Sequence, residues 1–174
     1  IDRASFQTCK GYLDRAAASP ECEIVAGGTC DDSKGWFVQP TVIRCSSPYY
    51  ESMVKEIFGP ILSVYVYPDD QLDETLKVCD TASPYALTGA IFAQDRQAIV
   101  KMERALRNSC GNFYINDKCT GAVVGQQPFG GARASGTNDK AGTGLNIIRW
   151  LSAHAVKEAF TPSAAIDYPY MAQP

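Results

Sequence analysis

The sequence predicts an α/β fold in which a mostly parallel β-sheet is covered by helices. Strand-like and helix-like segments alternate between residues 61 and 116, and this β-α-β-α-β order is typical of parallel sheets. The 174 residues are 45% hydrophobic and 20% charged, which indicates a globular chain with a packed core. A chain of this length buries about 70% of the surface that it exposes when unfolded, so it needs neither disulfides nor metal to fold.

The first part of the chain is expected to begin with a helix. Residues 5–18 are rich in helix-forming types, with Ser5 as the N-cap, and Pro20 disfavours continuation of the helix. Gly and Pro punctuate the sequence that follows, and the segments between them are expected to be extended. These segments are residues 23–26, 36–38 and 41–44.

The middle of the chain supplies the alternation of strands and helices. Residues 61–67 are β-branched and aromatic and end at Pro68, which predicts a strand. Asp69 is expected to cap a helix, because Leu72, Leu76 and Cys79 then share one helical face. The remaining elements expected here are a strand at 88–92, a helix at 95–107 and a strand at 112–116.

The last part of the chain is expected to contain a long loop, two short regular elements and a tail. Residues 117–144 are rich in Gly, Asn, Thr and Ser, and a loop of this length inside a compact domain is usually functional. A short helix is expected at 145–150 and a strand at 155–160. Residues 161–174 are expected to form an extended apolar tail that docks on another surface.

Charge, hydropathy and cysteine spacing exclude several classes of protein. The formal charge of −3 lacks the basic excess of a nucleic-acid binder, and no apolar run approaches the length of a membrane span. The seven cysteines are odd in number and dispersed, and there is a single histidine, which argues against a disulfide scaffold or a zinc site. We expect reduced thiols that fill the core.

The residues by themselves offer little nucleophilic chemistry. His154 is the only imidazole, and we interpret it as a surface or interface residue. Cys110 and Cys119 flank a predicted strand beside the glycine-rich loop. A thiol hydrolase that uses Cys119 and His154 remains a weaker hypothesis.

Two strings carry a resemblance to a known family. Glu-Ile-Phe-Gly-Pro stands at residues 56–60 and Pro-Phe-Gly-Gly at 128–131, with Gly-Asn-Phe-Tyr-Ile-Asn between them at 111–116. Together they resemble the C-terminal portion of the NAD(P)-dependent aldehyde dehydrogenase superfamily. Within it, the runs 111–118 and 125–140 resemble the L-glutamate γ-semialdehyde (Δ1-pyrroline-5-carboxylate) dehydrogenases of proline catabolism, and the likeness extends through nearly the whole chain.

The resemblance assigns roles to five residues, taken position by position. Glu56 matches the carboxylate that binds the nicotinamide-ribose hydroxyls of NAD, and Phe58 matches the aromatic beside the nicotinamide ring. Gly121 and Ala122 match the loop whose backbone N–H groups hold the α-carboxylate of L-glutamate γ-semialdehyde. Phe129 matches one wall of an aromatic box around the substrate chain. From the residues alone, core packing is the favoured explanation for Phe58 and Phe129.

The same resemblance implies what this chain lacks. The family's catalytic cysteine, oxyanion asparagine and general-base glutamate all lie upstream of the matching region, so no catalytic residue is expected among residues 1–174 and the chain alone is expected to be inactive. Because it lacks an initiator Met, we expect a piece of a longer enzyme. Residues 1–153 would belong to its catalytic domain and 154–174 to an oligomerisation strand and tail.

Partners and location also follow from the resemblance alone. It implies NAD as cofactor, a homodimer formed through the terminal strand and tail, and the mitochondrial matrix as the compartment. The alternative hypothesis, from another class, is a non-catalytic binding or regulatory module derived from such an enzyme.

Overall fold

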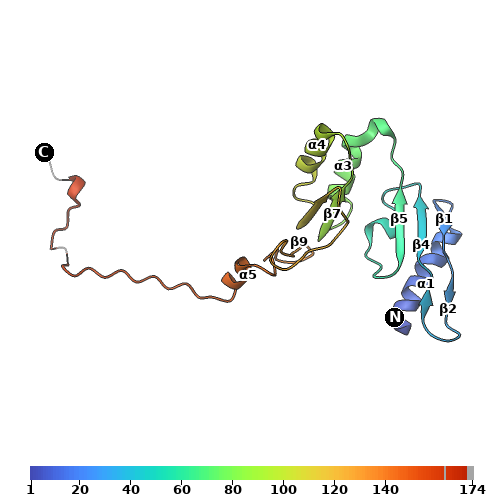
Figure 1. The fold of residues 1–174 in the computed structure, drawn as a ribbon, viewed down its shortest axis with the longest axis horizontal. Helices are drawn as coiled ribbons and strands as arrows, with labels where there is room; N and C mark the ends of the chain where they lie inside the picture. The colour runs from blue at the N-terminus through green and yellow to red at the C-terminus, as the bar shows by residue number, and fades with distance from the viewer. Residues whose placement is uncertain (163, 172–174) are drawn as a thin grey trace.

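A computed structural model describes residues 1–162 and 164–171, so part of the predicted tail, at 163 and 172–174, lies outside the described residues. The chain forms two lobes followed by an extended segment (Figure 1). We call residues 1–67 the N-lobe, residues 69–150 the C-lobe and the segment from residue 151 the tail. Each lobe has its own hydrophobic cluster.

The N-lobe is a helix packed on a three-stranded sheet, with strand order β1-β4-β5. β1 runs antiparallel to β4, whereas β5 runs parallel to β4 with Thr41 opposite Ile61. The core joins Leu13 of the helix to Ile43 of β4. The elements are α1 (Arg3–Ala18), β1 (Cys22–Ala26), β2 (Cys30–Asp31), β3 (Phe37–Val38), β4 (Thr41–Cys45), α2 (Glu51–Val54) and β5 (Ile61–Tyr65).

The C-lobe packs two helices against a parallel pair of strands, β7 and β8. Its core is formed by Leu76, Ile91, Ile99 and Leu106, which come from three different elements. A second, antiparallel pair joins β6 to β9. The elements are η1 (Asp69–Gln71), α3 (Leu72–Thr81), β6 (Tyr85–Ala86), β7 (Thr88–Ile91), α4 (Arg96–Leu106), β8 (Asn112–Ile115), β9 (Ala132–Arg133) and α5 (Gly144–Ile148).

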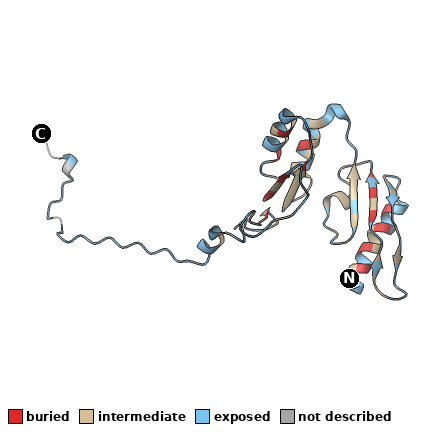
Figure 2. Cartoon of the chain, viewed as in Figure 1, coloured by how far each residue is buried: buried red, intermediate tan, exposed pale blue. Residues whose placement is uncertain are grey.

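The tail leaves the C-lobe after α5 and runs away from both lobes (Figure 1). Figure 2 shows that it is exposed along its described length, in contrast to the buried stripes of α1, β4 and the C-lobe helices. Its apolar residues are open to solvent, and Phe160 is 95% exposed. One short turn, η2 (Pro169–Met171), lies near its end. In the described part of the chain, no helix is long and apolar enough to cross a membrane.

The structure corrects two predicted helix starts. α1 begins at Arg3, and its N-cap is Asp2, whose carboxylate accepts a hydrogen bond from the Ser5 amide at 2.7 Å. The predicted cap, Ser5, therefore lies inside the helix, because the Asp2 carboxylate caps the first turn by accepting from the amide three residues later. Asp69 opens the 3₁₀ turn η1, and α3 follows at Leu72 without a side-chain cap.

The structure corrects one prediction about strands and leaves another unconfirmed. Within the described residues, the strands of the alternating region do not form one sheet, because β5 pairs with β4 in the N-lobe while β7 and β8 pair only with each other. The predicted strand at 155–160 is not confirmed, since these described residues pair with no strand of this chain. An apolar strand needs a neighbouring strand for its backbone groups, and the tail has none beside it here.

Candidate functional site

The first candidate residues lie on the segment between α2 and β5. Phe58 is 84% exposed and has φ of 59°, a left-handed conformation that is rare for a bulky side chain. Glu56 is exposed, and within the described residues its carboxylate has no hydrogen bond or ion pair. The two line an open depression of about 310 Å³ with Ser52 and Ile57. An exposed aromatic held in a strained backbone beside a free carboxylate is typical of a ligand site rather than of core packing.

The segment that carries Glu56 and Phe58 is fixed by contacts that involve α1 and α2. The Arg15 guanidinium donates to the Glu51 carboxylate at 2.5 Å, which ties the start of α2 to the end of α1. Ser63 of β5 donates to the Ser52 hydroxyl at 2.7 Å. Gly59 packs so closely on α1 that an added Cβ would lie 2.3 Å from the Cys9 sulfur. The backbone that carries Glu56 and Phe58 is therefore fixed by a direct contact with the helix.

The contact at Gly59 yields a testable prediction. Gly59→Ala should destabilise the protein by about 2 kcal/mol, because Cys9 is fully buried and its sulfur cannot move aside. Adding Cys9→Ala should recover most of that loss, since the residual Cβ of residue 9 would lie 3.8 Å from the new methyl group. Denaturant unfolding of the two single variants and the double variant checks this. Strictly additive losses would contradict the contact.

The second candidate region is the glycine-rich loop, where Phe129 is 38% exposed. Its backbone pairs with Ala141 through two hydrogen bonds of 3.0 and 2.8 Å. The Asn112 side chain holds both flanks, because Nδ2 donates to the Pro128 carbonyl at 2.9 Å and Oδ1 accepts from the Gly130 amide at 3.1 Å. Asn112 is only 3% exposed, so these bonds are shielded from water. The Phe129 backbone is thus fixed by a buried amide at the start of β8.

Close backbone packing reinforces this clamp. Gly111 lies so near the loop that an added Cβ would be 1.8 Å from the Gly130 carbonyl oxygen. Lys140, with φ of 55°, donates through Nζ to the Gly111 carbonyl. Nζ also lies 3.5 Å from Asn112 Oδ1 and from the Gly130 carbonyl oxygen. The loop therefore closes on β8 through an ammonium group that lies within hydrogen-bond distance of three uncharged oxygens.

The turn that carries Gly121 and Ala122 is anchored to the same strand. The Gly121 amide donates to the hydroxyl of Tyr114 at 2.9 Å, and the Tyr114 side chain is buried in β8. Gly121 and Ala122 are themselves half-buried. A ligand that used the Gly121 amide would take over the hydrogen bond that Tyr114 now accepts.

The structure groups the candidate residues into two sets. Glu56 and Phe58 belong to the N-lobe, and Gly121, Ala122 and Phe129 belong to the C-lobe. Within the described residues, no hydrogen bond or strand pairing joins the lobes.

The hypothetical thiol pair of Cys119 and His154 is not brought together. Cys119 is exposed in the glycine-rich loop and His154 in the tail, and in the described part of the chain no hydrogen bond or ion pair connects them. Nothing in the geometry therefore supports a thiol hydrolase.

Three residues of the C-lobe site escaped the sequence reasoning: Asn112, Tyr114 and Lys140. Asn112 and Tyr114 were interpreted only as strand residues, and Lys140 only as part of a loop motif. A polar amide at the start of an apolar strand is the one signal that could have indicated Asn112, because a buried amide needs partners. No sequence pattern reveals which loop carbonyls a lysine reaches.

Comparison with known proteins decides the family. The model described as "Aldehyde dehydrogenase family" matches residues 1–152. The chain belongs to the aldehyde dehydrogenase family. The family resemblance read from the 56–60 and 128–131 motifs is therefore confirmed, and so is the α/β fold class.

Individual relatives are similar over the whole chain. A mitochondrial delta-1-pyrroline-5-carboxylate dehydrogenase from Dictyostelium discoideum is 59% identical over 174 residues, which are 100% of this chain and 31% of that protein. The crystal structure of the delta-pyrroline-5-carboxylate dehydrogenase from Mycobacterium tuberculosis superposes with a TM-score of 0.83 at 52% identity, covering 99% of this chain and 32% of that one. A second structure of the M. tuberculosis enzyme, bound with NAD, gives a TM-score of 0.81 at 50% identity over 99% of this chain and 31% of that one.

The chain spans about a third of the length of these aldehyde dehydrogenase relatives. The lobe arrangement described above is thus that of one part of the family's fold.

Proposed function

We propose that the protein containing this chain is an NAD-dependent dehydrogenase that oxidises L-glutamate γ-semialdehyde, formed from Δ1-pyrroline-5-carboxylate, to L-glutamate in proline catabolism. The observation that carries the proposal is the exposed pair of Glu56 and Phe58, presented on a strained segment in a chain of this family. The names of the relatives support the choice of substrate.

The N-lobe set fits the nicotinamide end of NAD, which supplies the hydride acceptor when bound. The Glu56 carboxylate is free to accept hydrogen bonds from two ribose hydroxyls. The exposed ring of Phe58 offers a flat apolar surface that would limit where the nicotinamide lies. The depression of about 310 Å³ gives room for part of such a ligand only, which agrees with a chain that forms one side of the site.

The C-lobe set fits an amino-acid aldehyde. In this proposal Gly121 and Ala122 direct backbone N–H groups at the α-carboxylate, and the Tyr114 hydroxyl gives up the Gly121 amide to it. Phe129, clamped by Asn112, forms an apolar wall beside the aliphatic part of the substrate. The catalytic cysteine would come from outside residues 1–174, and we assign no catalytic residue to this chain.

Two further parts of the proposal concern assembly and location. The exposed apolar tail, with Phe160 and Ile166 almost fully open to solvent, supports a homodimer in which residues 154–174 pack on a second subunit. The mitochondrial relatives support a mitochondrial enzyme, in the matrix.

Variant kinetics of the protein expressed from its complete gene test the proposal. Glu56→Ala should weaken NAD binding about 30-fold, because about 2 kcal/mol of charge-assisted hydrogen bonding is lost. Glu103→Ala, at an exposed position of α4, is the matched control and should bind NAD normally. Equal NAD affinity in the wild type and Glu56→Ala would contradict the assignment.

A second measurement separates the proposal from its alternative. The complete protein should reduce NAD when given the semialdehyde, and residues 1–174 alone should not. A complete protein that binds NAD or the semialdehyde without turnover would instead favour a non-catalytic module.

A further inference from the structure

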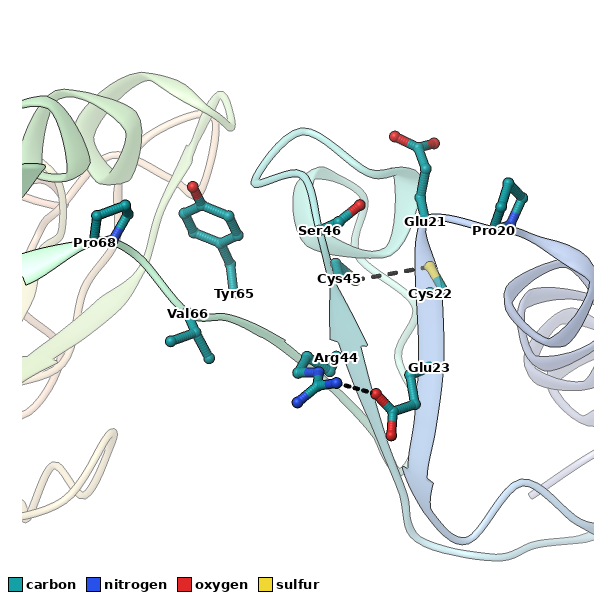
Figure 3. Close-up of a pocket in the computed structure, with 10 residues that line it drawn as sticks. All are labelled: Pro20, Glu21, Cys22, Glu23, Arg44, Cys45, Ser46, Tyr65, Val66 and Pro68. Carbon is teal, nitrogen blue, oxygen red and sulfur yellow. Dashed lines mark hydrogen bonds and ion pairs between the residues drawn. The ribbon is translucent and has the colours of Figure 1, made fainter.

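Two of the seven cysteines face each other across neighbouring strands. Cys22 opens β1 and Cys45 ends β4, and the strand register places them directly opposite one another. Their sulfur atoms are 4.0 Å apart (Figure 3). Both thiols are free, and Cys22 packs on the core cluster that contains Cys45.

The backbone pattern at this point suits a disulfide. The Ser46 amide donates to the Glu21 carbonyl at 2.9 Å, so residues 21 and 46 form a hydrogen-bonded pair and the next pair, Cys22 and Cys45, is non-hydrogen-bonded. Residues in such pairs have Cα atoms about 4.5 Å apart, which lies inside the range that disulfides span. Side-chain rotation alone can therefore close the gap between the sulfur atoms.

The pair is also reachable. Both cysteines line an open depression of about 500 Å³, together with Arg44, Tyr65 and Val66 (Figure 3). Cys22 is half-buried, whereas Cys45 is 2% exposed. Burial also raises the pKa of the Cys45 thiol. Cys22 is the more accessible of the two thiols and is therefore the better first nucleophile.

We propose that Cys22 and Cys45 form a reversible intramolecular disulfide when the protein meets a small disulfide such as oxidised glutathione. The Cys22 thiolate attacks one glutathione sulfur, which forms a mixed disulfide and releases one glutathione thiolate. Cys45 loses its proton, attacks the Cys22 sulfur and releases the second glutathione thiolate. The protein loses two protons and two electrons, and one oxidised glutathione becomes two reduced ones. This site is independent of the proposed dehydrogenase activity.

Mass spectrometry of the protein expressed from its complete gene tests the site. After treatment with oxidised glutathione, alkylation and trypsin without reductant, peptide 16–34 should be found linked to peptide 45–55, and dithiothreitol should separate them. Because peptide 16–34 also holds Cys30, the matched control is Cys30→Ser, which should keep the link. Cys22→Ser should lose it.

The outcomes decide the matter in either direction. The proposal is overturned by any of three results: both peptides are fully alkylated, Cys22 carries a glutathione adduct without the link, or the link persists in Cys22→Ser. If Cys22→Ser fails to fold, Cys30→Ser still decides it, since its 16–34 peptide holds a single thiol.

Discussion

Gly111→Ala is expected to remove most activity toward the aldehyde while leaving NAD binding intact. The new methyl group would lie 1.8 Å from the Gly130 carbonyl oxygen. The methyl carbon is bonded directly to the Cα of residue 111, and the oxygen belongs to the backbone of Gly130. No side-chain rotation relieves such a contact, so the loop that carries Phe129 must shift, at a cost of about 3 kcal/mol. We expect kcat/KM for the semialdehyde to fall at least ~100-fold.

The design of this experiment separates displacement from unfolding. Glu56 and Phe58 lie on the other lobe, so NAD affinity reports whether the protein is still folded. Gly144→Ala is the matched control, because nothing lies within 4 Å of an added Cβ there. Wild-type kcat/KM in Gly111→Ala would contradict the close approach of the loop to β8.

Asn112→Ala is expected to raise KM for the semialdehyde about tenfold with little change in KM for NAD. The substitution leaves the Pro128 carbonyl and the Gly130 amide without their buried partner, which costs about 3 kcal/mol in the two unmade hydrogen bonds. Phe129, which stands between them, would lose its fixed position. Steady-state kinetics with each substrate varied in turn, combined with denaturant unfolding, measures both effects.

Asn116, which directly follows the other end of β8, provides a matched control. Its side chain also makes two hydrogen bonds, both of 2.8 Å, but to the backbone of Ala93 rather than to the glycine-rich loop. Asn116→Ala should therefore lose stability, the more so because the φ of residue 116 is 54°, and should keep a normal KM for the semialdehyde. A rise in KM of the same size in both variants would show that Asn112 acts only through stability.

Local signals in the sequence were sufficient for most elements. The helix at 95–107 and the strand at 112–116 are found at α4 and β8, because apolar spacing and β-branched content reflect local packing faces. The cap at Asp2 and the pairing of β5 with β4 were missed. The first depends on which nearby side chain reaches a helix amide, and the second on which strand lies beside β5. Composition does not contain that information.

For the candidate site, the sequence indicated side chains but not the scaffold that supports them. The motif at 56–60 named Glu56 and Phe58, and the structure shows them exposed on a strained segment. The amide of Asn112, the hydroxyl of Tyr114 and the ammonium of Lys140 fix the second set through contacts across 7 to 29 residues of sequence. Such contacts exist only after the loop has folded back on β8.

By itself, then, the sequence determined the family and the α/β class and named candidate residues for a ligand site, because those depend on residue type and local spacing. Only the tertiary structure decided the division into two lobes, the backbone approach of Gly111 to Gly130 and the pairing of Cys22 with Cys45. The physical reason is that these features depend on distances between segments remote in sequence, which strand register and helix packing set and which no local pattern encodes.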